Sequence, residues 1–151
     1  MSSITLLDVI ALNACYGDAL DRFDLAAWKA LFTPGAVYRA QARENFDRSL
    51  PLAAIYLDGH GMMADRITGI EKTLVFAPRS TRHVIGLPVL EGDRARTPFI
   101  VMQTIGSQPP ETLATGCYHD TLATTADGLR LAARNAVYDN ALIPNSLVYP
   151  L

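Results

Sequence analysis

The chain has 151 residues, the usual size of one domain with a single hydrophobic core. Half of the residues are apolar and the formal net charge is −2, so the chain lacks the basic surface of a nucleic-acid binder. No apolar run is long enough to cross a bilayer, and residues 1–5 lack the basic start and the long apolar stretch of a signal peptide. We therefore expect a single cytoplasmic domain over residues 1–151 that binds neither nucleic acid nor a membrane.

The first part of the chain has the spacing of two helices. Apolar residues recur close to the helical period over residues 4–20, with Asp8 near the start. A second, shorter helix is predicted from Leu25 to Phe32, with Asp24 as its N-cap and Thr33-Pro34-Gly35 as its stop.

Two strands and a third helix are predicted next. Residues 36–42 and 52–57 have the composition of short strands. The segment Met62–Leu74 is predicted to be helical, because its apolar residues fall on one stripe with charged residues outside it. The stripe consists of Met62, Met63, Ile67, Ile70 and Leu74.

After Pro78 the sequence becomes a run of strands. The stretches rich in Val, Ile, Leu, Thr and Tyr are 81–90, 97–106, 112–125 and 129–139. Turns are predicted at residues 91–93 and 126–128, and the Asp127-Gly128 pair predicts an antiparallel hairpin between the last two strands. Helices segregated from antiparallel strands predict an α+β domain. A sheet curved around the helices would bury all three, and the segment from Tyr16 to Val37 resembles the entrance to the cone of nuclear-transport-factor-2-like, or SnoaL-like, domains.

A cone of this kind has an open end where acid–base chemistry could occur. The ionisable candidates are His83, His119 and Asp120, and the residues placed to assist them are Tyr38, Tyr118 and Asp21. Neighbours on a strand face opposite sides, so a dyad would pair His83 with Asp120 from different strands, with the histidine as general base. The alternative, which we favour, is that these groups are structural hydrogen-bond partners at the rim or in a subunit contact.

The sequence contains no recognisable metal or cofactor motif. Its three histidines are scattered, and we expect His60, in the loop 58–61, to be solvated. Cys15 and Cys117 stand about a hundred residues apart, which excludes a Rieske ligand set of two Cys and two His in this chain alone. We expect both cysteines to be reduced, buried thiols, with a disulfide or a catalytic thiol as the less favoured alternatives.

Several segments of the chain resemble one family. They are residues 38–57, with Arg43-Glu44-Asn45 and Leu50-Pro51-Leu52-Ala53; residues 61–70; the pair Arg82-His83; and residues 127–151, with Ile143-Pro144-Asn145-Ser146-Leu147. Together they are similar to the small (β) subunit of aromatic-ring-hydroxylating dioxygenases, in particular to the salicylate-hydroxylase and terephthalate-dioxygenase branch.

The resemblance implies a trimeric subunit with no catalytic centre of its own, which supports a large (α) subunit. In this family the large subunit holds the Rieske iron–sulfur cluster, the mononuclear iron and the pocket for the aromatic, often carboxylate, substrate. Under that reading this chain has no catalytic, cofactor-binding or metal-binding residue. The alternative is a stand-alone dehydratase, isomerase or cyclase of the same cone fold, in which His83 and Asp120 act as acid and base and Tyr38 orients the substrate.

Two parts of the surface are candidate contacts with a partner. The segment Leu142–Leu151 is strongly apolar, and it can either dock on a neighbouring chain or pack back on its own sheet. Arg39, Arg43 and Arg48 suit ion pairs across an interface, or else form a solvated loop edge. The interface candidates are Arg39, Arg43, Arg82, Pro144, Asn145, Leu147 and Tyr149.

Overall fold

The computed structural model describes residues 3–144 and 146–151. The helices are α1 (Leu6–Asp21), α2 (Leu25–Ala30), α3 (Arg43–Asp47) and α4 (Gly59–Thr68), which continues into the π-type turn η1 (Gly69–Thr73). The strands are β1 (Phe32–Ala42), β2 (Ile55–Asp58), β3 (Arg79–Ile85), β4 (Val89–Glu91), β5 (Arg94–Ile105), β6 (Glu111–Thr125) and β7 (Gly128–Tyr138). Within these ranges, no helix is long and apolar enough to cross a membrane.

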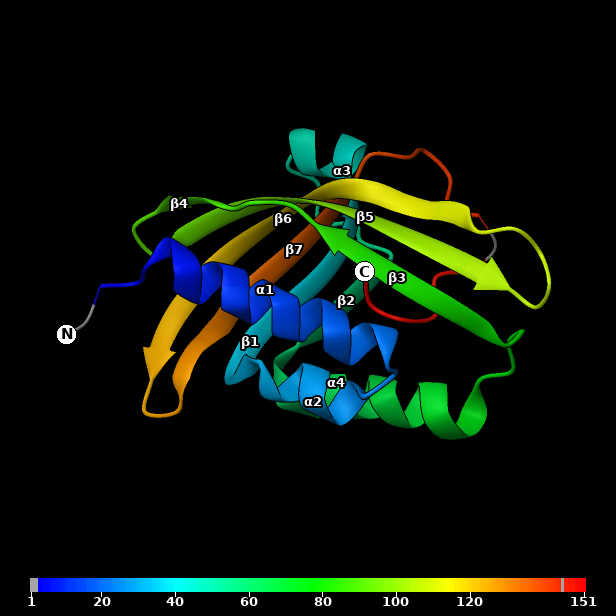
Figure 1. Ribbon diagram of the computed structural model, residues 1–151, viewed down its shortest axis with the longest axis horizontal. Coiled ribbons are helices and arrows are strands. Elements are labelled where there is room, and N and C mark those ends of the chain that lie inside the picture. The colour runs from blue at the N-terminus through cyan, green and yellow to red at the C-terminus, as the bar shows by residue number, and fades with distance from the viewer. Residues whose placement is uncertain (1–2, 145) are drawn as a thin grey trace.

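The strands form one curved sheet, and α1 lies across its concave face (Figure 1). The order is β2-β1-β7-β6-β5-β3, and β4 pairs with β5 beside this path. All pairings are antiparallel except that of β1 with β7, which is parallel. The expected α+β domain with a curved, mainly antiparallel sheet is confirmed, and the sheet is open rather than closed into a barrel.

Both N-terminal helices begin at the side-chain caps that their sequences provide. Thr5 and Asp8 form a reciprocal capping box at α1, since each side chain accepts a hydrogen bond from the other residue's backbone N–H, at 3.2 and 2.9 Å. The Asp24 carboxylate accepts from the backbone N–H of Ala27 at 2.9 Å, so the predicted N-cap of α2 is confirmed.

The end of the second helix was predicted two residues too late. α2 stops at Ala30, and Phe32 already belongs to β1, where it pairs with Leu131 of β7. The Leu31 carbonyl accepts the backbone N–H of Leu131 at 2.9 Å, so pairing with a distant strand takes the residues that local propensity assigned to the helix. The stop signal at Pro34-Gly35 therefore lies inside β1, where the register with β7 shifts.

The turns predicted for the second half are confirmed. Gly92 and Gly128 sit in the β4–β5 and β6–β7 turns with φ of +65° and +104°, values that favour glycine. β6 and β7 pair antiparallel around the second turn, as expected. The stretch predicted as one strand at 81–90 divides into β3 and β4, which both pair with β5.

The third helix departs from the predicted stripe. Met63 and Ile70 are buried, but Met62 and Leu74 are 41% and 48% exposed. The π-type turn η1 has more residues per turn than an α-helix, so Leu74, which follows it, no longer continues the stripe of α4. The short helix α3, which follows β1, was not predicted.

The apolar tail packs back on its own domain. Val148 and Leu151 belong to the buried core, and Ile143, Leu147 and Tyr149 pack against it. In Figure 1 the chain's C-terminal end lies between α1 and β3, in the hollow of the sheet. Of the two outcomes left open for this segment, the structure shows the intramolecular one for most of its length, while Leu142 stays 85% exposed.

One position tests how tightly β6 and β7 approach each other. A Cβ added at Gly116 would overlap the Val137 carbonyl, so we expect Gly116→Ala to lower the free energy of unfolding by about 2 kcal/mol or more. The measurement is urea denaturation. Gly35→Ala is the control, because its Cβ would meet no atom within 4 Å and should change stability by less than about 0.5 kcal/mol. Equal effects of the two substitutions would contradict this account.

Candidate functional site

Strand alternation sorts the candidate residues between the two faces of the sheet, as predicted. The His83 side chain is 1% exposed, whereas that of its neighbour Arg82 is 76% exposed. On β6, Tyr118 and Asp120 are buried, and His119 faces outward, with its ring 4.5 Å from that of Phe46 in α3. The polar groups inside the cone therefore include His83, Tyr118 and Asp120.

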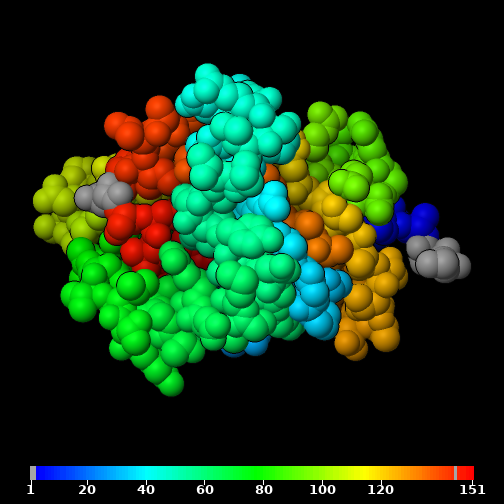
Figure 2. Space-filling model, turned by 180° about the vertical axis from the view of Figure 1, so that it is seen from behind, coloured from blue at the N-terminus to red at the C-terminus, as the bar shows by residue number. Residues whose placement is uncertain are grey.

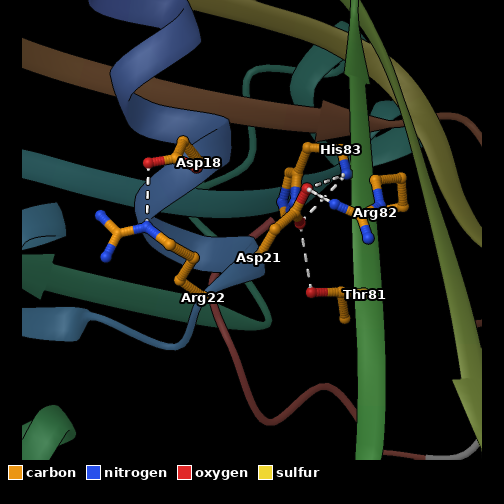
Figure 3. A network of polar contacts seen from close by, with 6 residues as sticks. All are labelled: Asp18, Asp21, Arg22, Thr81, Arg82 and His83. Carbon is orange, nitrogen blue, oxygen red and sulfur yellow. Dashed lines mark hydrogen bonds and ion pairs between the residues drawn. The ribbon is translucent and has the colours of Figure 1, made fainter.

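His83 is held by Asp21, the last residue of α1 (Figure 3). The Asp21 carboxylate accepts the backbone N–H of His83 at 3.1 and 3.0 Å and lies 2.7 Å from Nδ1 of the ring. Burial by itself would raise the pKa of Asp21, but the hydrogen bonds from His83 and the charge of Arg82 outweigh it and leave the pKa below its usual value. An ionised Asp21 selects the tautomer of His83 that carries its proton on Nδ1, and the buried Nε2 has no partner among the described residues.

Asp120 has a different partner, the fully buried Arg134 of β7. The two side chains form a bidentate ion pair, with Nε and Nη2 of Arg134 at 2.8 and 2.7 Å from the carboxylate oxygens. The same Nη2 donates to Asn13 of α1 at 2.5 Å. The rings of Tyr16 and Tyr118 lie 4.1 and 4.0 Å from the guanidinium carbon. Burial alone would lower the pKa of Arg134, but the Asp120 charge outweighs it, so the pKa is raised and the guanidinium stays charged.

A third set of contacts ties the tail to the interior. The hydroxyls of Tyr16 and Tyr38 donate to the main-chain oxygen of Leu151 at 2.5 and 3.2 Å, and the backbone N–H of Leu151 donates to the Tyr38 hydroxyl at 2.8 Å. Burial raises the pKa of Tyr38 well above its usual value, so this phenol remains a neutral donor. The interior of the cone is thus occupied by the chain's own residue 151, which is fully buried.

The pairing of His83 with Asp120 that the acid–base alternative required is not formed. Each side chain has another partner, Asp21 for His83 and Arg134 for Asp120. Sequence reasoning named Asp21 only as an assisting residue, and it missed Arg134 and Asn13. The one signal for Arg134 was strand parity, because it lies opposite Asp120 in the β6–β7 register and so faces the same side of the sheet.

The remaining expectations have mixed outcomes. His60 was expected to be solvated, but its Nε2 lies 3.0 Å from the Phe32 carbonyl oxygen. Cys15 was expected to be buried and is exposed, while Cys117 is half-buried, and both are free thiols. No cluster of three or more His, Cys, Asp or Glu with metal-binding geometry occurs in the described part of the chain.

The interface candidates lie on the surface or close beneath it. Arg43 is paired with Asp139 at 2.7 Å, and Arg82 lies 3.8 Å from Asp21. Tyr149 packs its ring against Phe23 and Phe76. Arg39, Pro144 and Leu147 are partly buried. Asn145 lies outside the described residues.

Comparison with known proteins identifies the family of this chain. The SnoaL-like domain family matches residues 5–135. A crystal structure from Novosphingobium aromaticivorans, assigned as the beta subunit of an aromatic-ring-hydroxylating dioxygenase, is 34% identical, covers 95% of this chain and 94% of its own, and superimposes with a TM-score of 0.84. The chain belongs to the SnoaL-like domain family, among the beta subunits of aromatic-ring-hydroxylating dioxygenases.

Other relatives of this SnoaL-like chain carry similar names. Subunit beta 2 of the terminal oxygenase component of terephthalate 1,2-dioxygenase from Comamonas sp is 29% identical over 98% of this chain and 99% of its own length. The small subunit of anthranilate 1,2-dioxygenase from Burkholderia cepacia is 26% identical over 97% and 94%. The resemblance drawn from the sequence segments is therefore confirmed.

Removing the counterion of Arg134 should destabilise this SnoaL-like domain strongly. Asp120→Asn leaves a buried cation without its charge partner, so we expect a loss of about 3–5 kcal/mol in the free energy of unfolding, measured with urea. Replacing both residues, as Asp120→Leu with Arg134→Met, should recover much of that loss, because no buried charge remains. A near-neutral effect of Asp120→Asn alone would show that the ion pair does not hold the interior together.

The Asp21–His83 contact should produce a stability difference that depends on pH. We expect Asp21→Asn to cost about 1–3 kcal/mol at pH 7, because a charged acceptor of buried hydrogen bonds is lost. The pKa of Asp21 is depressed in the folded state, so its contribution is complete above about pH 4 and disappears as the pH falls through the folded-state value. Urea denaturation across pH 2–7 should therefore show the two proteins converging in acid.

A matched control lies one turn earlier on α1. Asp18 forms only an exposed ion pair with Arg22, so Asp18→Asn should change stability by less than about 1 kcal/mol. A cost of Asp21→Asn that stays the same down to pH 2 would contradict the role given to its charge.

Proposed function

We propose that this chain is the non-catalytic small subunit of a Rieske non-haem iron oxygenase that hydroxylates an aromatic ring. The observation that carries the proposal is the full-length match, at 34% identity, to a chain assigned as such a beta subunit. The names of the terephthalate and anthranilate dioxygenase subunits suggest an aromatic carboxylate as the substrate of the assembly. In this proposal the Rieske cluster, the mononuclear iron and the substrate pocket belong to the large subunit.

The interior of the domain supports a structural role. Several of its polar groups bind internal partners: Arg134 is neutralised by Asp120, and the hydroxyls of Tyr16 and Tyr38 hold the main chain of Leu151. Such internal partners stabilise the shape of the domain, and a stable shape is what a supporting subunit contributes to an assembly. The stand-alone enzyme is disfavoured, because His83 and Asp120 do not form the pair on which it relied.

The proposal extends to the assembly. We expect three copies of this chain to associate in the cytoplasm with three large subunits. The residues proposed to take part are Arg39, Arg43, Arg82, Pro144, Asn145, Leu147 and Tyr149. Arginine suits such contacts, because its planar guanidinium binds carboxylates through two hydrogen bonds.

Co-purification tests the proposal directly. The chain is co-expressed with the Rieske-type large subunit of its own source, which carries an affinity tag, and the eluate is analysed by size exclusion with light scattering. We expect the two chains in equal numbers. Three copies of the small subunit should together contribute about three times 16.4 kDa to the mass of the complex. An untagged large subunit controls for adhesion to the resin. Two well-folded proteins that never associate would refute the proposal.

A further inference from the structure

Arg39 occupies an unusual position in the middle of β1. Its neighbours Tyr38 and Ala40 point into the core, so Arg39 lies on the outer face of the sheet. In the register it stands between Tyr56 of β2 and Asn135 of β7. The Tyr56 ring lies 5.1 Å from the guanidinium carbon, which is the distance of a cation–π contact.

Among the described residues, the Arg39 side chain has no hydrogen-bond or ion-pair partner. Every other arginine in the described residues donates a hydrogen bond or lies in an ion pair, but Arg39 does neither. Its Nε is buried, whereas its two terminal nitrogens remain accessible. Stacking on Tyr56 uses the face of the guanidinium and leaves its N–H edge free to bind an acceptor. A half-buried cation without a counterion is costly, so the missing acceptor calls for an explanation.

Arg39 lines a groove that is already organised. The groove has a volume of about 350 Å³ and is also lined by Gln41, Phe46, Ser49, Leu50, Pro51 and Asn135. Gln41 is fixed by donating to the carbonyls of Leu50 and Leu52 at 2.7 and 3.1 Å and by accepting from Asn135 at 2.8 Å. The Oδ1 atom of Asn135 is buried without a partner in the described part of the chain, so a donor and an acceptor that lack partners there lie on neighbouring strands at this groove.

Apolar side chains surround this cation. Leu50, Leu52 and Tyr56 are 41%, 63% and 43% exposed. Figure 2 looks onto the face that bears the segment after β1, which runs as a turquoise ridge down the middle of the molecule. A preorganised arginine beside a tyrosine and within an apolar rim is the usual composition of an energetic hot spot at a protein interface.

We propose that the groove around Arg39 binds an aspartate or glutamate side chain of the large subunit. The carboxylate supplies the two acceptors that the guanidinium edge lacks. The apolar rim then excludes water from the ion pair, which strengthens it. This inference rests on the proposed function, because the large subunit is the partner that the function provides.

The experiment measures the affinity of the large subunit for the full-length small subunit and for Arg39→Gln. We expect Arg39→Gln to raise the dissociation constant about 30-fold or more, since loss of a desolvated charge pair at a hot spot has effects of this size. Arg39→Lys keeps the charge but not the planar fork, so it should fall between the two. Arg94→Gln replaces an exposed arginine at the start of β5. It is the matched control and should bind as the wild type does.

Two further readouts separate docking from folding. The thermal midpoint of isolated Arg39→Gln should stay close to that of the wild type, because the substitution removes a cation without an ionic partner among the described residues and loses only its contact with the Tyr56 ring. Added salt should weaken the wild-type complex more than the variant complex. If Arg39→Gln is instead unstable, Arg39→Leu serves as the second variant, with the same expected loss of affinity.

Several outcomes would overturn the inference. Unchanged affinity for the large subunit in Arg39→Gln would do so, as would a loss confined to self-association of this chain, which would make a second copy the occupant of the groove. A wild-type chain that does not bind the large subunit at all would instead refute the proposed function, and the inference with it. The wild-type arm of the experiment therefore distinguishes the two failures.

Discussion

The interior of this domain depends on burying one charge, the guanidinium of Arg134. An isolated cation could not remain there, because removing it from water costs far more than a domain's net stability. The cost is offset by the bidentate Asp120 carboxylate, by Asn13 and by two aromatic rings close to the guanidinium. These partners come from α1, β6 and β7, so the ion pair joins the first helix to the centre of the sheet.

Two other contacts complete the attachment of α1. The carboxylate of Asp21, at the end of this helix, binds the backbone N–H and the ring Nδ1 of His83. These hydrogen bonds anchor the edge strand β3. Tyr16, on the same helix, binds the main chain of Leu151, and Tyr38 of β1 binds it from the sheet. The residues that looked most like catalytic groups in the sequence therefore hold one helix, one edge strand and the tail in place.

The inner and outer faces of the sheet are organised in opposite ways. Inside, the charged groups of Arg134, Asp120 and Asp21 are paired with internal partners, and the tail fills the hollow. The Tyr118 hydroxyl and Nε2 of His83 are buried there without a partner among the described residues. Outside, Arg39 presents an unmatched cation with apolar side chains around it. Matched groups stabilise the fold, whereas an unmatched charge on a rigid strand is available to a partner. This contrast accords with a subunit whose contribution lies on its surface.

Local sequence signals determined the fold class, the N-cap at Asp24, the hairpin at Asp127-Gly128 and the separation of His83 from Arg82 and of His119 from Asp120 onto opposite faces. Each depends on neighbouring residues, through helix capping, turn conformation or strand parity. The sequence also carried a recognisable family resemblance over most of its length. Only the tertiary structure decided that His83 meets Asp21, that Asp120 meets Arg134, that Phe32 joins β1 and that Leu151 fills the interior. Those outcomes depend on the register of β1 against β7 and on the placement of α1 across the sheet, which no local pattern specifies.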